Sequence, residues 1–339
     1  IEKIDSIALD ALRLGAYQIL RTRVENHAAV NTSVELVKAH GAGQASGFVN
    51  GVLRGLTRKK PETWIERVAP GNELADISLR NAHPEWIAQV FAESLGVDPA
   101  TEEGRSELEY ALAADDARPI VHLAARPGQI SGEELALITG GAEGRFSPYA
   151  VYLDEGAPGD IAPVREGLAS VQDEGSQLIA LATTRVPVAA ELPGRWLDLC
   201  AGPGGKTAFI ASAALSEQAS VDAVEIAQHR ATLIEQTVRE LPVRVHVGDG
   251  RKLEEIKSLN IPEGGFTRVL IDAPCSGLGA LRRRPEARWT KSPEDVPPLV
   301  ALQRELLTSG LAAAAPGGVV IYSTCSPHPK ETTDVVRSV

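Results

Sequence analysis

The chain has 339 residues but no methionine and only three cysteines, and aromatic side chains make up 4% of it. Three widely spaced cysteines are a poor framework for disulfides, so we expect reduced thiols and a cytoplasmic location. Runs of about 18 apolar residues are absent, which argues against an ordinary membrane span. The start of the chain also lacks a basic segment followed by an apolar stretch, and we therefore expect no signal peptide.

Acidic residues outnumber basic ones, 45 to 34, and the formal net charge is −11. This balance argues against a protein that coats nucleic acid over its whole surface, but it allows a local basic groove. The densest basic cluster comprises Arg282, Arg283, Arg284 and Arg288, followed by Trp289. One interpretation is a solvated charged loop. Because the cluster closely follows a candidate active-site cysteine, we favour a binding role.

Residues 1–114 have the periodicity of helices. Apolar residues recur there at spacings of three and four, as in Leu9, Leu12 and Ala16, which predicts an all-α domain. Residues 115–170 mix two patterns and predict a small α+β unit. Strand candidates lie at 119–124 and 149–153, and a helix candidate lies at 133–138.

From about residue 190, strand and helix patterns alternate, which predicts a parallel, doubly wound α/β sheet. The strand candidates are 195–200, 220–226, 243–247, 268–272 and 319–323, with helical patterns at 207–215, 227–241 and 300–315. Sheets of this kind usually continue beyond a fifth strand. We therefore expect closing strands beyond Val339, where this chain stops.

Each cysteine follows a predicted strand, at the edge where open parallel sheets bind their ligands. Cys200 lies in Trp-Leu-Asp-Leu-Cys-Ala-Gly-Pro-Gly-Gly-Lys-Thr, Cys275 in Asp-Ala-Pro-Cys-Ser-Gly and Cys325 in Tyr-Ser-Thr-Cys-Ser. A small buried side chain is the common role of a free cysteine. The polar loops around Cys275 and Cys325, and helices that can lower a thiol pKa there, favour a nucleophile instead. Neither the cysteines nor the scattered histidines have the spacing of metal ligands, and we expect no metal.

The glycine-rich loop after Cys200 opens a helix, and glycines let the backbone approach a ligand there. Its spacing fits neither the phosphate-binding P-loop nor the dinucleotide motif. The next two strands end in Glu225 and Asp249, which are either caps and solvated residues or contacts to ribose and adenine. Two acids at successive strand ends favour an adenosine-type cofactor. Because both phosphate motifs fail, we predict S-adenosyl-L-methionine.

The motifs around the three cysteines resemble those of the Nop/Sun family of RNA cytosine-5 methyltransferases. Residues 171–177, Val-Gln-Asp-Glu-Gly-Ser-Gln, resemble the segment before the family's catalytic domain. Residues 12–18 and 48–54 resemble the NusB-type helical domain of the bacterial members that act on 16S ribosomal RNA. The resemblance implies three domains, which are a NusB-like domain at 1–114, a small RRM-like α+β subdomain at 115–170 and a class I (Rossmann-like) methyltransferase domain at 171–339.

The resemblance also implies roles for single residues. Cys325 is the nucleophile that adds to C6 of cytosine, Cys275 assists product release, and Asp272 contacts the base. The positions that bind S-adenosyl-L-methionine are Cys200, Ala201, Gly202, Pro203, Gly204, Gly205, Lys206, Glu225, Arg230, Asp249 and Asp272. The target cytosine has to be unpaired or flipped out. We expect the basic cluster at 282–289 to hold phosphates and stack a base.

The favoured function is therefore methylation of cytosine C5 in 16S ribosomal RNA, by an enzyme that we expect to be a monomer. The same chemistry on transfer RNA or another RNA is the alternative within this class. A non-catalytic RNA-binding or assembly protein is a second alternative, although a pure binder needs neither Cys275 nor Cys325. A nicotinamide oxidoreductase is disfavoured because the dinucleotide motif fails.

Overall fold

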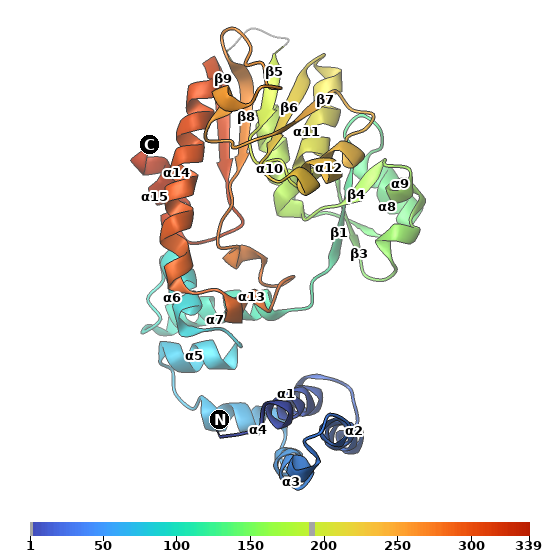
Figure 1. Cartoon of the computed structure of the whole chain (residues 1–339), viewed down its shortest axis with the longest axis vertical. Helices are drawn as coiled ribbons and strands as arrows, with labels where there is room; N and C mark the ends of the chain where they lie inside the picture. Colours follow the sequence, from blue (N-terminus) through green and yellow to red (C-terminus); the bar gives the residue numbers. More distant parts are fainter. Residues whose placement is uncertain (1–2, 190–193) are drawn as a thin grey trace. The chain divides into compact units, whose positions relative to one another are not determined.

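Five helices make up the N-terminal part of the computed structural model, which describes residues 3–189 and 194–339. The chain divides into two units, Ile1–Glu85 and Trp86–Val339. The first unit, drawn in blue shades in Figure 1, contains α1 (Ser6–Arg21), α2 (Asn26–Ala39), α3 (Ser46–Leu56), α4 (Pro61–Val68) and α5 (Leu74–Arg80). Asp5 caps α1 by accepting the Ile7 and Ala8 N–H groups, and the core packs Ala11 against Leu53.

The next two helices, α6 (Glu85–Leu95) and α7 (Glu102–Asp116), confirm the helical character predicted as far as residue 114. They group with the second unit because they pack against the segment 278–288. Ile87 and Val90 of α6 are buried against Leu278 and Leu281. The two units thus divide at Glu85, and the domain limits at 114 and 170 stay predictions.

Four short strands form an antiparallel sheet in the order β2-β3-β1-β4. They are β1 (Val121–Ala125), β2 (Ala142–Glu143), β3 (Ala150–Leu153) and β4 (Ala169–Val171), accompanied by α8 (Gly132–Thr139) and α9 (Ala162–Arg165). The strands β1 and β3 and the helix α8 confirm the three elements predicted here. Leu123 and Val151 are register partners, and both are fully buried in the core of this sheet.

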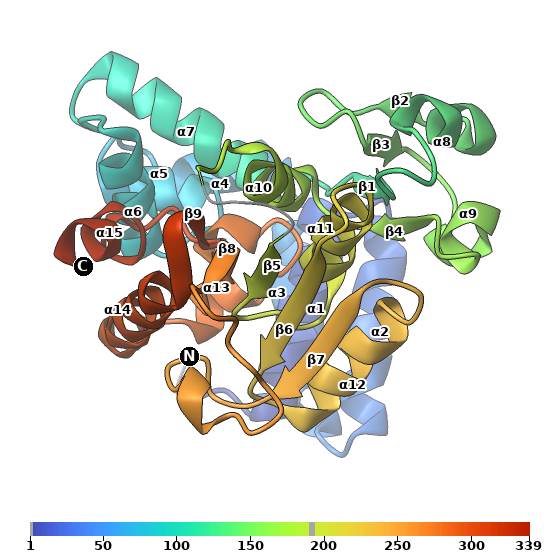
Figure 2. The ribbon, with the colours of Figure 1, turned by 90° about the horizontal axis from the view of Figure 1, so that it is seen from above.

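Five parallel strands form the larger sheet in the order β7-β6-β5-β8-β9, which confirms the predicted doubly wound α/β fold (Figure 2). The strands are β5 (Arg195–Asp198), β6 (Ser220–Glu225), β7 (Val243–Val247), β8 (Phe266–Asp272) and β9 (Ala314–Ser323). The helix predicted at 300–315 ends earlier, at Ala313, where β9 follows directly. Pro316 accounts for this correction, because proline cannot continue a helix.

Helices cover both faces of the larger sheet. On one face, α10 (Glu174–Arg185), α11 (Gly205–Ser216) and α12 (Gln228–Thr237) share a core with Trp196 and Leu270. On the other, α14 (Val296–Ala313) and α15 (Thr333–Ser338) pack with Leu197 and Val269, and α13 (Ala287–Thr290) precedes α14. Neighbouring strand residues thus point to opposite faces. None of the helices within 3–189 and 194–339 has the length and hydropathy that crossing a membrane requires.

Candidate active site

The site lies where the strand order of the larger sheet reverses. The strand β5 has β6 on one side and β8 on the other, so successive crossovers leave it in opposite directions. Crevices of this kind, at the carboxyl ends of the strands, are the usual ligand sites of open α/β sheets. The glycine-rich loop follows β5, and the loop containing Cys275 follows β8. The predicted motifs therefore meet at one edge of the sheet.

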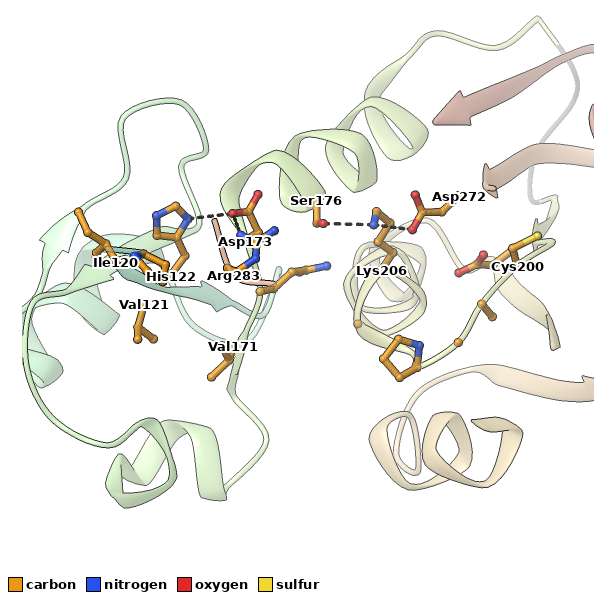
Figure 3. A pocket seen from close by; sticks show the side chains of 17 residues that line it. Ile120, Val121, His122, Val171, Asp173, Ser176, Cys200, Lys206, Asp272 and Arg283 are labelled. Atoms are coloured by element: carbon orange, nitrogen blue, oxygen red, sulfur yellow. Dashed lines mark hydrogen bonds and ion pairs between the residues drawn. The ribbon is translucent and has the colours of Figure 1, made fainter. Parts of the chain in front are cut away.

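A cavity of about 420 Å³ opens between this edge and the small sheet (Figure 3). One wall consists of the glycine-rich loop with Lys206 and Asp272, and the opposite wall comes from β1 and β4 with the start of α10. Residues that line it from the smaller sheet and α10 include Ile120, Val121, His122, Val171, Asp173 and Ser176. The segment 171–177 therefore lies beside the glycine-rich loop, which its resemblance to the family segment did not reveal.

The glycine-rich loop is held by the end of β6. Glu225 is buried, and its Oε2 accepts the Gly202 N–H at 3.1 Å, while Oε1 accepts the Ala227 N–H at 2.9 Å. Arg230 donates to the Gly202 carbonyl at 2.5 Å. A Cβ at Gly202 would lie 2.1 Å from Glu225 Oε2, so a larger residue here would displace the carboxylate that holds the loop. Glu225 and Arg230, both predicted cofactor residues, thus hold the loop in shape.

The loop continues into α11 through Gly204, whose φ of +107° favours glycine as well. Directly after it, the Lys206 ammonium donates to Asp272 Oδ2 at 2.7 Å and to the Ser176 hydroxyl at 3.2 Å (Figure 3). The Ser323 hydroxyl donates to Asp272 Oδ1 at 3.1 Å. Both oxygens of Asp272 therefore have partners that fix its side chain at the cavity wall.

A second carboxylate of the cavity, Asp198, was missed by the sequence analysis. Its Oδ2 accepts the Thr207 hydroxyl at 2.7 Å, while its Oδ1 is buried and has no hydrogen-bond partner among the described residues. Burial raises the pKa of Asp198 to about 7. The signal was present in the sequence, because an acid inside an otherwise apolar strand needs a reason to be there.

Two of the three cysteines face each other. Cys275 Sγ and Cys325 Sγ are 3.3 Å apart, and the hydrogen bond from the Cys275 thiol lowers the pKa of Cys325 to about 7. The same hydrogen bond, together with burial, raises the pKa of Cys275. Of the two thiols, Cys325 is therefore the one that ionises more readily, and the thiolate is the nucleophilic form of cysteine. The third cysteine, Cys200, lines the cavity, and burial raises its pKa.

A smaller cavity of about 310 Å³ links the first cavity to the cysteine loops. It shares Ile120, His122, Asp173 and Arg283 with the first cavity and extends to Gly279 and Pro327. Gly279 donates its N–H to the Cys325 carbonyl at 2.8 Å, so this cavity borders the loop of Cys325. Arg283 and Asp173 form an ion pair where the two cavities meet (Figure 3).

The predicted basic cluster divides into buried and exposed members. Arg288 is 3% exposed, and it donates to Asp116 Oδ1 at 2.7 Å and to the Asp115 carbonyl at 2.8 Å. A guanidinium enclosed in this way leaves no surface for a phosphate, so we withdraw Arg288 from the expected RNA contacts. Arg282 donates to the Arg118 carbonyl at 3.1 Å. Arg284 and Trp289 are exposed.

Asp249, the acid predicted to contact adenine, is paired with a neighbour. Arg251 donates to Asp249 Oδ2 at 2.6 Å and also reaches Glu305 at 2.9 Å. This hydrogen bond lowers the pKa of Asp249 and keeps its carboxylate ionised. Asp249 does not line the larger cavity in the described part of the chain, and its cofactor role stays a prediction.

Comparison with known proteins places the chain in one family. The family described as 16S rRNA methyltransferase RsmB/F matches residues 187–339, and the NusB family matches residues 1–58. A "putative methyltransferase" of Mycobacterium tuberculosis (strain H37Rv) is 52% identical over 338 residues, which are 99% of this chain and 71% of that protein. Ribosomal RNA small subunit methyltransferase B of Cronobacter sakazakii is 34% identical over 337 residues, or 96% of this chain and 72% of that protein.

Two solved structures share the fold. The crystal structure of PH0851 matches with a TM-score of 0.77 and 22% identity, covering 99% of this chain and 73% of that one. The structure of NSun6 from Pyrococcus horikoshii with SFG matches with a TM-score of 0.60 and 15% identity, covering 76% and 87%. Both likenesses extend over the larger part of this chain.

A doubly wound parallel sheet with a glycine loop at its switch point and a NusB-family N-terminus defines a Rossmann-like methyltransferase. The chain belongs to the 16S rRNA methyltransferase RsmB/F family, as its motifs predicted. Membership confirms S-adenosyl-L-methionine as the cofactor.

Proposed function

We propose that this protein methylates C5 of a cytosine in 16S ribosomal RNA, with Cys325 as a covalent nucleophile. The observation that supports the proposal most is the cysteine pair, in which Cys275 lies 3.3 Å from Cys325 and the pKa of Cys325 is lowered to about 7. A protein that only binds RNA has no need of such a thiolate. The names of its relatives, which are small subunit ribosomal RNA methyltransferases, support the choice of RNA.

The larger cavity suits S-adenosyl-L-methionine. Asp198 lines this cavity, and its buried Oδ1 has no hydrogen-bond partner within 3–189 and 194–339, so it would accept from the ammonium group of the cofactor. The loop from Cys200 to Lys206 and Asp272 line this cavity and would hold the remainder of the cofactor. Glu225 and Arg230 would act by shaping the loop, and Asp249, which lies outside the lining, stays a predicted contact. When bound, the cofactor supplies an activated methyl group on a sulfonium sulfur.

The chain's own residues account for the remaining chemistry. C5 of cytosine is a weak nucleophile until the Cys325 thiolate adds to C6 and turns C5 into an enamine carbon. Asp272, fixed by Lys206 and Ser323, accepts a hydrogen bond from the base and holds C6 in reach of the thiolate. After methylation the C5 proton passes to water, its bonding electrons re-form the C5=C6 double bond, and the C6–S bond breaks so that Cys325 leaves as a thiolate. Cys275, in contact with Cys325, assists this release.

The smaller cavity provides a place for the target nucleotide. It borders the Cys325 loop, and Arg282 and Arg283 line it together with Asp115 and Asp173. A phosphate would replace Asp173 as the partner of Arg283. Exposed Arg284 and Trp289 would extend the contact to neighbouring phosphates and bases. We further propose that the enzyme acts as a monomer without a metal.

A trapping experiment tests the proposal. The Cys275→Ala protein is incubated with S-adenosyl-L-methionine and unmodified 16S ribosomal RNA, and a denaturing gel is examined for a covalent adduct. We expect a slowly migrating band that is lost in Cys275→Ala/Cys325→Ala. A band with transfer RNA alone would overturn the substrate, and no band with any RNA, in protein that binds the cofactor, would overturn the mechanism.

A further inference from the structure

One buried carboxylate, that of Glu331, holds the loops of both cysteines. Glu331 ends the short 3-10 helix Pro329–Glu331 that follows Cys325, and it is 0% exposed. Its Oε1 accepts the Ser276 N–H at 2.8 Å, and its Oε2 accepts the Ser276 hydroxyl. Ser276 directly follows Cys275 in the chain. The carboxylate thus fixes one side of the Cys275 loop.

A buried amide fixes the other side of that loop. Gln303 of α14 is 0% exposed, and its Nε2 donates to the Pro274 carbonyl at 2.9 Å and to Glu331 Oε1 at 3.1 Å. Pro274 and Ser276 flank Cys275 in the sequence. Both neighbours of Cys275 are therefore held by one connected pair, Gln303 and Glu331.

The same network reaches the second cysteine. Ser276 Oγ lies 3.0 Å from Ser326 Oγ, and Ser326 directly follows Cys325. The Tyr322 hydroxyl donates to the Glu331 carbonyl at 2.8 Å, which ties the short helix to the end of β9. The hydrogen bonds of this network thus fix the backbone on which both thiols stand.

Burying the Glu331 carboxylate costs free energy, which an apolar side chain at this position would not. The groups that donate to the Glu331 carboxylate, Ser276 and Gln303, are neutral. A buried carboxylate satisfied only by neutral donors costs more free energy than a well-packed apolar side chain of similar size. The network also sits within the catalytic edge of the sheet. The presence of an acid at this costly position therefore indicates a role for Glu331 in placing the neighbouring cysteine pair.

We propose that Glu331 and Gln303 are positioning residues that hold the Cys275 thiol against Cys325, so that Cys275 donates its proton toward the nucleophile. The inference rests on the proposed function only in taking Cys325 as the nucleophile. Without the network the loops would separate, the hydrogen bond between the thiols would be lost, and Cys325 would ionise at higher pH. The other titratable groups that face the pair are Asp272, Lys206 and Tyr322.

The rate at which Cys325 is alkylated reports the pH at which its thiol ionises, and the measurement needs neither RNA nor cofactor. The full chain is treated with iodoacetamide across a pH series, and the modified Cys325 peptide is quantified by mass spectrometry. We expect the midpoint of the unchanged protein near pH 7. In Glu331→Gln we expect it to rise by at least about one unit, so that alkylation at pH 7 slows roughly tenfold. A midpoint that does not move, in a folded variant, would overturn the proposal.

Two further variants make the test specific. Glu305→Gln, on the same helix as Gln303 but exposed, is the matched control and should leave the midpoint unchanged. Ser276→Ala removes the hydroxyl between Glu331 and Ser326 and serves if Glu331→Gln does not fold; it should shift the midpoint in the same direction. Failure of the trapping experiment with a normal alkylation profile would reject the RNA chemistry but leave the positioning role intact.

Discussion

Lys206 Nζ lies 2.7 Å from Asp272 Oδ2, so one ion pair joins the glycine-rich loop to the end of β8. The first residue belongs to the predicted cofactor loop, and the second belongs to the strand that leads to Cys275. The pair lies at the cavity wall, with Ser176 and Ser323 donating to or accepting from its two ends. In the proposed function, the cofactor and the base would meet at this fixed carboxylate.

Replacing this carboxylate should affect catalysis more than folding. Asp272→Asn keeps the shape of the side chain but removes the ion pair with Lys206 and weakens the hydrogen bond accepted from the base, and we expect the methylation rate to fall by about 100-fold. The thermal midpoint should change by only a few degrees, because the group is partly exposed. Single-turnover assays with labelled cofactor measure the rate. An unchanged rate would contradict the role given to Asp272.

The pH dependence of adduct formation should follow the Cys325 thiol. Its pKa is lowered to about 7, so the reactive thiolate is scarce below that pH and dominant above it. We expect the rate to rise with pH through about 7 and then level off. In Cys275→Ala, which loses the hydrogen bond, the rise should move to higher pH. Rapid-quench measurement of the adduct in both proteins tests this, and equal midpoints would count against the thiol contact.

Asp198 should make cofactor binding depend on pH. Burial raises its pKa to about 7, so the ionised form that attracts an ammonium group is present above that pH and lost below it. We expect the affinity for S-adenosyl-L-methionine to rise between about pH 6 and 8. Asp198→Asn should bind about tenfold more weakly at the higher pH and show no such rise. Titration calorimetry without RNA measures the affinity in both proteins. The same dependence of affinity on pH in the variant as in the unchanged protein would exclude Asp198 as the acceptor.

Replacing Arg288 should lower the stability of the protein, whereas replacing Arg284 should not. Arg288→Ala leaves the buried side of Asp115 and Asp116 without its cation, and we expect a loss of about 3–5 kcal/mol in the free energy of unfolding. Arg284→Ala alters only an exposed side chain and should leave stability within about 0.5 kcal/mol. Denaturant unfolding measures both variants, and similar losses would show that the burial of Arg288 is unimportant.

Binding to 16S ribosomal RNA should depend on the arginines at 282–284 and not on the buried Arg288. Arg282→Ala/Arg283→Ala/Arg284→Ala should weaken binding and flatten its dependence on salt, because fewer counterions are released. Folded Arg288→Ala should bind as the unchanged protein does. Affinities measured over a range of salt concentrations provide the comparison. Identical salt slopes for all proteins would place the RNA elsewhere.

Local motifs made much of this protein predictable. The parallel sheet follows from alternating strand and helix patterns, and the glycine loop and cysteine loops occupy the strand ends where the sequence placed them. These features depend on residues close together in the chain. Gly202 and Gly204, placed directly after an apolar strand, were enough to predict the loop, because glycine allows the tight turn that the backbone makes there.

Residues that act across long sequence separations were not predictable. Arg288 was grouped with its basic neighbours, since nothing local distinguishes a buried arginine from an exposed one when its partners are Asp115 and Asp116. Gln303 lies in the middle of a helix and has no motif of its own. Its role emerges only when α14 packs against the strand edge and brings the amide to the Pro274 carbonyl.

The contact between Arg288 and the end of α7 also sets an order of events during synthesis. The Arg288 guanidinium donates to Asp116 and to the Asp115 carbonyl, which lie 172 and 173 positions before it in the chain. While a ribosome is still making the strands of the larger sheet, α6 and α7 have emerged but lack the segment on which they pack. The wall that α6 and α7 contribute to the smaller cavity therefore cannot be complete until the segment 278–288 has been synthesised.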